Sequence, residues 1–209
     1  MNIKSYDELT SLELDTLKEI GSIGTGNAAT SLSSLIGMPV RIQMPEVRIM
    51  GYNEAIEWIG GPEEITAGVL VGMGGQISGI MLSVQQLEFV NLVLETMLGK
   101  TVGDYTELTE MEHSALTEVG NIMISTFINA LSSLAGIDID LTVPAFTVDM
   151  QGAIMTVPMA EYGGQSDYIM TIGGDFICNG KKIPCRLLLS PDIRSLNFLL
   201  RKLGVDSGQ

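Results

Sequence analysis

Residues 116–136 read LTEVGNIMISTFINALSSLAG, and residues 17–37 read LKEIGSIGTGNAATSLSSLIG. Sliding the chain along itself by 99 positions aligns residues 10–45 with 109–144 without a gap, and 12 of the 36 pairs are identical. Identity at this level in a single register indicates an internal duplication. We therefore predict two repeats of one unit, at approximately residues 10–99 and 109–204.

Each repeat opens with a predicted long helix. A threonine followed three residues later by a glutamate is the pattern of a capping box, in which each side chain satisfies a free backbone donor near the other. This pattern occurs at Thr10–Glu13 and at Thr109–Glu112. Gly37 and Gly136 stand where a left-handed C-terminal cap belongs. Each helix is therefore predicted to run about 25 residues.

The rest of each repeat predicts short strands and a closing helix. Segments rich in β-branched residues lie at 38–58, 66–84, 137–157 and 167–190, with glycine-containing turns expected at Gly72–Gly75 and Asn179–Gly180. Residues 83–100 and 190–205 predict the closing helices, which end at Gly99 and Gly204. This order predicts an α+β fold. We expect residues 1–209 to form a single pseudo-twofold domain, in which two intertwined repeats build a mainly antiparallel sheet flanked by long helices.

The charge balance excludes several classes of partner. Eleven basic residues against 25 acidic ones give a net charge of −14, which repels nucleic acid and anionic membranes and favours partners with basic surfaces.

The N-terminal residues lack the apolar run of a signal peptide. The longest apolar stretch, 122–134, is too short and too often interrupted by polar residues to cross a bilayer. We expect a cytoplasmic protein without membrane insertion.

Cysteine and histidine give no sign of a metal or redox site. Cys178 and Cys185 lack the two-residue spacing of a zinc or redox pair, and we expect two reduced thiols in a strand pair. His113 is the single histidine, and one histidine builds neither a metal cluster nor a histidine-based triad. We predict no metal and no cofactor of the protein's own.

A narrow polar arc recurs on both long helices. With Leu17 at zero on a helical wheel, Leu17, Ala28, Leu32 and Leu35 form the predicted buried stripe, and Leu116, Phe127, Leu131 and Leu134 form its counterpart. Asp15, Glu19 and Ser22 fall on the opposite side, as do Ser114, Glu118 and Asn121. A solvated helix face is the ordinary interpretation of such an arc. Its recurrence in register favours a site, although common ancestry alone could leave some identities.

The glycines of the first helix require a separate explanation. Gly21, Gly24 and Gly26 each cost about 1 kcal/mol in a helix interior relative to alanine. The stretch lacks the Lys-Ser or Lys-Thr ending of a phosphate loop and follows no predicted strand, which disfavours nucleotide binding. We expect close approach of another backbone or a partner's loop, and a structural role for Asn27.

The spacing of these polar residues resembles a family signature. The pattern is Asp or Ser, three residues, Glu, two residues, Asn, twenty-two residues and Pro. It resembles the signature of the CheC, CheX and FliY family of chemotaxis phosphatases, and the CheC branch most of all. Ser114, Glu118, Asn121 and Pro144 match every position. Asp15, Glu19 and Pro45 match in the first repeat, where Ser22 departs from the asparagine.

The resemblance implies hydrolysis of the aspartyl phosphate of the response regulator CheY. It implies that Asn121 orients the attacking water and that Glu118 forms an ion pair with the regulator's lysine. The magnesium ion is expected in the regulator's site. Glu19 and Ser22 would form a weaker second site, with Asp15, Ser114, Pro45 and Pro144 in supporting positions. We expect a monomer with two pseudo-symmetric sites on opposite faces of the domain.

Two other functions stay open at this point. The resemblance also implies binding to the receptor deamidase CheD, and the chain could act mainly as a non-catalytic adaptor of CheD. Alternatively, it could be a structural part of the flagellar switch, whose proteins contain a related domain. Fold kinship alone does not choose between these roles and catalysis.

Overall fold

In the computed structural model, which describes residues 3–162 and 167–205, both long helices begin at their predicted capping boxes. Helix α1 (Ser11–Ile36) and helix α4 (Glu110–Ala135) each contain 26 residues, close to the predicted length. Gly37 and Gly136 follow them with φ of 68° and 61°, the left-handed conformation that glycine adopts at low cost. The predicted helix boundaries are confirmed.

The other elements complete two similar halves. The first contains β1 (Val40–Gly51), α2 (Tyr52–Ile59), β2 (Ile65–Gly75), β3 (Gly79–Gln85) and α3 (Leu87–Leu98). The second contains β4 (Ile139–Leu141), β5 (Ala145–Met150), α5 (Gln151–Ile154), α6 (Thr156–Tyr162), β6 (Tyr168–Cys178), β7 (Lys181–Pro191) and α7 (Ile193–Lys202). Single 3₁₀ turns at Tyr6–Glu8 and Tyr105–Glu107 precede the two long helices.

The halves exchange strands within one sheet. Its order is β1-β6-β7-β3-β2-β4, β5 also pairs with β2, and every pair is antiparallel. The first half's β1 thus pairs with β6 of the second, and β4 and β5 pair with β2 of the first. Neither half contains a complete sheet, so the predicted α+β fold of intertwined repeats is confirmed.

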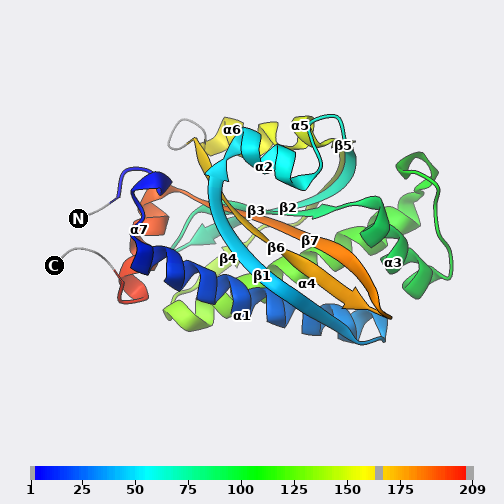
Figure 1. Ribbon diagram of the computed structural model, residues 1–209, viewed down its shortest axis with the longest axis horizontal. Helices are drawn as coiled ribbons and strands as arrows, with labels where there is room; N and C mark the ends of the chain where they lie inside the picture. Colours follow the sequence, from blue (N-terminus) through cyan, green and yellow to red (C-terminus); the bar gives the residue numbers. More distant parts are fainter. Residues whose placement is uncertain (1–2, 163–166, 206–209) are drawn as a thin grey trace.

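Helices cover both faces of this sheet, as Figure 1 shows, with α1 and α4 on one face and α2, α5 and α6 on the other. The larger core joins α1, α3, α4 and α7 to the sheet, and a smaller core lies under α2 and α5. Figure 1 also shows α1 and α4 side by side and running in opposite directions.

Close packing explains two of the three helical glycines. A Cβ at Gly24 would collide with the buried ring of Phe127, and one at Gly21 would collide with Val47 of β1. The close approach at these two positions comes from side chains, not from the expected backbone of another segment. A Cβ at Gly26 would meet nothing within 4 Å, so no packing within the described structure requires a glycine there.

The predicted buried stripe is confirmed except at its C-terminal end. Six of its members are at most 3% exposed, namely Leu17, Ala28, Leu32, Leu116, Phe127 and Leu131. Leu35 is partly buried, whereas Leu134 is 47% exposed. Leu134 lies in the last turn of α4 and lines an open groove between the two helices.

Two segments expected as strands are helical instead. In α2 the buried residues lie at the spacing of one helix face, and they are Tyr52, Ala55, Ile56 and Ile59. The segment was predicted as a strand because it directly follows the β-branched residues of β1. Residues 151–162 form α5 and α6 on the same face of the sheet. Helices α2 and α5 contribute buried side chains to the smaller core and cover it on this face of the sheet.

The two expected hairpin turns have different outcomes. Asn179 and Gly180 connect β6 to β7 with φ of 50° and 78°, which confirms the two-residue turn. Residues 72–75 instead belong to β2, and the turn follows them at residues 76–78. Gly75 alone has a left-handed φ, of 86°, at the end of the strand.

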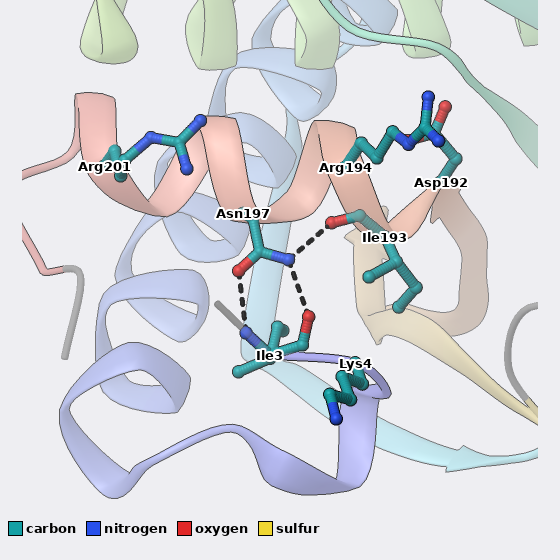
Figure 2. Close-up of a pocket in the computed structure, with 7 residues that line it drawn as sticks. All are labelled: Ile3, Lys4, Asp192, Ile193, Arg194, Asn197 and Arg201. Atoms are coloured by element: carbon teal, nitrogen blue, oxygen red, sulfur yellow. Dashed lines mark hydrogen bonds between the residues drawn. The ribbon is translucent and has the colours of Figure 1, made fainter. Parts of the chain in front are cut away.

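The N-terminal segment is fastened to α7 by one buried amide. The Oδ1 of Asn197 accepts a hydrogen bond from the backbone N–H of Ile3 at 2.8 Å, and its Nδ2 donates to the carbonyls of Ile3 and Ile193, each at 2.8 Å (Figure 2). A buried side chain that satisfies three backbone groups holds α7 and the segment before α1 as one unit.

An ion pair fixes the start of α4. The Nζ of Lys100 lies 2.8 Å from Oε1 of Glu112, whose other oxygen accepts from Thr109 in the capping box. The hydrogen bond from Lys100, with those from Thr109, lowers the pKa of Glu112 from 4.5 to about 2. The connecting segment between the halves is thereby tied to the second long helix.

This pair predicts a loss of stability in acid. Because the folded-state pKa of Glu112 is depressed, its contribution is complete above pH 4.5 and is lost as the pH falls toward about 2. In denaturant titrations between pH 7 and pH 2, Lys100→Met is expected to reduce the fall in unfolding free energy over this window. Lys181→Met, which removes an exposed lysine elsewhere, should leave it unchanged. An identical pH profile for Lys100→Met and the parent would contradict the assignment.

Within the described residues, no helix combines the length and apolar character needed to cross a membrane.

Candidate functional site

The polar arc of α4 reaches solvent as predicted. Ser114 and Glu118 are exposed and Asn121 is partly buried. Residues three and four positions apart on a helix are neighbours on one face, with Cβ atoms about 5–6 Å apart. The structure therefore presents Glu118 and Asn121 together, in adjacent turns, to whatever meets the outer side of α4.

Close packing on the inner side holds this part of α4 against the sheet. A Cβ at Gly120 would lie 2.5 Å from a methyl group of Val69 and 2.9 Å from Nε2 of Gln85. That Nε2 donates to the carbonyl of Leu116 at 3.1 Å, and the Tyr105 hydroxyl donates to the carbonyl of Gln85 at 2.9 Å. The glycine before Asn121 thus lets the helix lie directly on β2 and β3, which fixes the backbone from which the amide projects.

The carbonyl of Asn121 has a partner within its own helix. The hydroxyl of Ser125 donates to it at 2.7 Å. In α1 the carbonyl of Ser22 accepts from Thr25 at 3.2 Å. Both helices thus keep a hydroxyl one turn after the signature amide position.

The corresponding arc of α1 is open to solvent. Asp15, Glu19 and Ser22 are all exposed. Lys18 lies 2.9 Å from Asp15, but both side chains are more than half exposed, with 55% and 70% of their surface accessible. A pair in that setting contributes little to stability. The side chains of this arc are therefore available to a partner.

The two arcs lie on the same face of the sheet. Because α1 and α4 pack on one face and run in opposite directions, the arcs lie on either side of the crossing (Figure 1). The crossing is marked by the 3.1 Å hydrogen bond between Thr126 and Ser31. At 1.5 Å per residue, Glu19 and Glu118 are separated by roughly 20–30 Å along the helices. The expectation of opposite faces is wrong, because both helices that carry the arcs pack on the same face of the sheet.

The signature prolines lie at interruptions of the strands along the sheet edges. In β1, Met44 and Pro45 form a bulge between Gln43 and Glu46, and Met44 has a φ of 49°. Pro144 stands at the equivalent break between β4 and β5. Proline has no N–H to donate, so it suits an edge position where the ladder is interrupted. Pro45 thus lies within β1 and Pro144 between β4 and β5, and neither lies on the helices that carry the carboxylates.

One ring contact links the second proline's strand to α4. The ring of Phe146, two residues after Pro144, lies 4.9 Å from that of His113. His113 immediately precedes Ser114, is partly buried and packs against this ring.

The two cysteines behave as expected. Cys178 in β6 and Cys185 in β7 are buried and free. Burial raises the pKa of the Cys185 thiol to about 12, which keeps it protonated and unreactive at neutral pH. In residues 3–162 and 167–205, no group of three or more His, Cys, Asp or Glu side chains is placed to hold a metal ion.

Sequence analysis missed two members of the arc. On the same helical wheel, Leu12 and Met111 fall at about 220°, beside Glu19 and Glu118 at about 200°. Leu12 is 64% exposed and Met111 is 65% exposed. The signal was present in the sequence, as an apolar residue at a polar angle in both repeats.

The signature residues do not line the hollow between α7 and the N-terminal segment. That hollow has a volume of about 740 Å³, and Figure 2 shows Lys4, Arg194 and Arg201 around it. Glu118 and Asn121 instead project from a helix surface. Side chains exposed on a helix surface can form a catalytic site only together with the binding site of a partner protein.

Comparisons with known proteins find similar sequences and similar folds. Residues 12–49 and 111–148 each match the model of the CheC-like family, and the two matches keep the 99-residue offset of the repeat. The CheY-P phosphatase CheC of Bacillus subtilis (strain 168) is 24% identical over 196 residues, which are 92% of this chain and 94% of that protein.

Two solved structures share the fold. The X-ray crystal structure of Thermotoga maritima FliY has a TM-score of 0.72 and 22% identity, covering 96% of this chain and 100% of that one. A chain of the CheX-CheY-BeF3-Mg2+ complex from Borrelia burgdorferi has a TM-score of 0.54 and 19% identity, covering 86% of this chain and 99% of that one. Both repeats thus match the CheC-like family model in register, and the similarity to a CheC extends along nearly the whole chain.

Proposed function

We propose that this protein hydrolyses the aspartyl phosphate of a CheY-type response regulator. The observation that supports it best is the exposed Glu118 beside the partly buried Asn121 on one face of α4. The related CheC is named a CheY-P phosphatase, and a protein of similar fold has been solved in complex with CheY. Proteins of this family would thus act on a partner that carries its own phosphorylated site.

Asn121 would orient the attacking water. Its amide oxygen can accept a hydrogen bond from water while its N–H groups donate to a phosphoryl oxygen, and its stem is short and stiff. The water oxygen bonds to phosphorus as the bond from phosphorus to the aspartate oxygen breaks. The regulator's aspartate leaves as a carboxylate, and the protons of the water stay with the inorganic phosphate. Positioning of this kind is the main contribution that phosphoryl transfer requires of an enzyme.

Glu118 would hold the helix in place. An exposed carboxylate one turn before Asn121 can form a charge-assisted ion pair with a lysine of the regulator's site. We expect the magnesium ion to be bound by the regulator, where it would neutralise charge on the phosphoryl group. In this proposal the regulator supplies the cavity, the metal and the lysine, and α4 supplies the amide and the carboxylate.

We also propose that the α1 arc is the weaker of two sites. Ser22 keeps a hydrogen-bonding group, but its oxygen lies closer to the backbone than the amide of Asn121 would. A misplacement of about 1 Å in a catalytic group can cost about a hundredfold in rate. Glu19 remains able to form the ion pair.

A second interaction, with the deamidase CheD, is proposed from the family resemblance. The net charge of −14 suits a partner with a basic surface. We expect this interaction to accompany catalysis rather than replace it.

The carboxylate can be tested by Glu118→Gln. We expect kcat/KM for the phosphorylated regulator to fall about tenfold or more, because the ion pair with the lysine is lost. Stopped-flow decay of phospho-CheY at several salt concentrations measures it, and the variant should show a weaker salt dependence than the parent. Glu95→Gln, at an exposed position on α3, makes the same charge change outside the arc and should have no effect.

The same variant separates catalysis from adaptor function. Binding of CheD, measured by calorimetry, should survive Glu118→Gln. If CheD binding were lost while phospho-CheY decay stayed at the parental rate, the adaptor function would be the better description.

A further inference from the structure

Two exposed apolar side chains extend the signature arc in both repeats. Leu12 and Met111 are pseudo-equivalent, 99 positions apart, and their exposed fractions are 64% and 65%. Each lies in the first turn of its helix, three residues before the Asp or Ser of the signature. The two long helices therefore present the same apolar feature at the same place.

A single exposed apolar residue would carry little meaning, because such residues are common on protein surfaces. The comparison with the neighbouring position makes this pair informative. Ser11 becomes Glu110 in the second repeat, whereas Leu12 becomes Met111, which changes shape but stays apolar. Neither helix formation nor the capping box requires this, since both positions are exposed and precede the glutamate of the box.

The distance to the signature residues suits one continuous contact. Met111 lies seven residues before Glu118 and ten before Asn121, or about 10 and 15 Å along the helix. A specific interface of ordinary size covers about 800 Å² on each partner, which is enough to include all three side chains. A regulator that reached Asn121 would therefore also cover Met111.

We propose that Met111, and Leu12 in the weaker site, are apolar anchors for the phosphorylated response regulator. Each would contact an apolar area of the regulator beside its phosphorylated aspartate. This inference rests on the proposed function and adds a specificity determinant to it. The ion pair of Glu118 selects the register of docking, and the anchor supplies binding that does not depend on salt. Methionine suits this role because its flexible side chain adapts to an irregular surface.

The anchor should affect binding and leave the chemical step unchanged. An apolar contact away from the phosphoryl group is equally strong in the ground and transition states, so its loss raises KM without changing kcat. For Met111→Gln, which keeps the length of the side chain, we expect KM for phospho-CheY to rise about tenfold at unchanged kcat. The Kd for the beryllofluoride-activated regulator should rise by a similar factor. Leu12→Gln should have a smaller effect, because it alters the weaker site.

Three further variants make the test specific. Met111→Leu, which installs the residue of the first repeat, should keep the parental KM. Leu134→Gln removes an exposed apolar residue of the same helix, 47% exposed and outside the arc, and should also keep it. Thermal unfolding of Met111→Gln should match the parent, since the side chain is mostly exposed, so a change in KM reports docking and not folding.

The outcomes separate this inference from the function on which it rests. If Asn121→Ala lowers hydrolysis while Met111→Gln leaves both KM and Kd unchanged, the anchor is wrong and the proposed function stands. A fall in kcat at constant KM for Met111→Gln would also overturn the anchor, because it would place the side chain in the chemical step. If hydrolysis is unaffected both by Asn121→Ala and by Asn121→Ala combined with Ser22→Ala, the proposed function fails and the anchor falls with it.

Discussion

Asn121→Ala is expected to lower the rate of phospho-CheY hydrolysis by about a hundredfold, because no other side chain of α4 can orient the attacking water. Alanine lacks both the acceptor and the donors of the amide, and the packing of Gly120 on Val69 prevents the helix from shifting to bring in a substitute. The residual rate should be that of the α1 arc, with Ser22. Decay of radiolabelled phospho-CheY under single-turnover conditions measures the change.

A matched control variant, and a comparison with the α1 arc, decide how this result is interpreted. Asn129→Ala makes the same substitution at an exposed position of α4 beyond the signature and should leave the rate unchanged. If Ser22→Ala abolished turnover while Asn121→Ala kept it, the α1 arc would be the principal site and the ranking would be reversed.

Adding an asparagine to the first repeat should transfer the activity. In the Asn121→Ala background, Ser22→Asn is expected to restore hydrolysis to within a few-fold of the parental rate, a gain of roughly thirtyfold or more over the single variant. Glu19 stands one turn before Ser22, and both are exposed, so the completed arc would have the same composition as that of α4. The same decay assay on the double variant measures the gain.

The transfer has its own control. Ser34→Asn in the same background places an asparagine at an exposed hydroxyl position of α1 outside the arc and should restore nothing. A double variant that stayed as slow as Asn121→Ala alone would show that the α1 helix lacks more than an amide, and that the two arcs are not equivalent surfaces.

The long helices could be predicted closely because their signals are local. Capping boxes at Thr10 and Thr109 and glycines at 37 and 136 lie next to the ends they define, and the structure places the helix ends there. The Asn179–Gly180 turn was predictable for the same reason. Local hydrogen bonds and backbone preferences decide these features, so they can be recognised in a short window of sequence.

The remaining fold depends on contacts between distant residues. Helix α2 follows β1 without a break, and its burial pattern has meaning only once the second core under it is known. The position of both arcs on one face of the sheet depends on how α1 and α4 pack together, and the sheet itself pairs β1 with β6 across more than a hundred residues of sequence. The hydrophobic periodicity of one segment does not show which distant strand that segment pairs with.

The candidate site was predictable in its polar residues and not in its surroundings. Glu118 and Asn121 stand in a spaced pattern that the duplication makes visible. The contact of Gln85 with the Leu116 carbonyl joins residues far apart in sequence, so only the structure reveals it. Met111 was visible on the helical wheel, but an apolar residue on a polar arc acquires meaning only once its exposure is known.

The most direct test is a crystal structure of this protein with CheY activated by beryllofluoride and Mg²⁺. The account predicts that α4 lies across the phosphorylation site, with the Glu118 carboxylate within about 3 Å of the regulator's lysine and the Asn121 amide beside the fluorides. It would be contradicted if the regulator were bound through another surface, with Glu118 and Asn121 left in solvent.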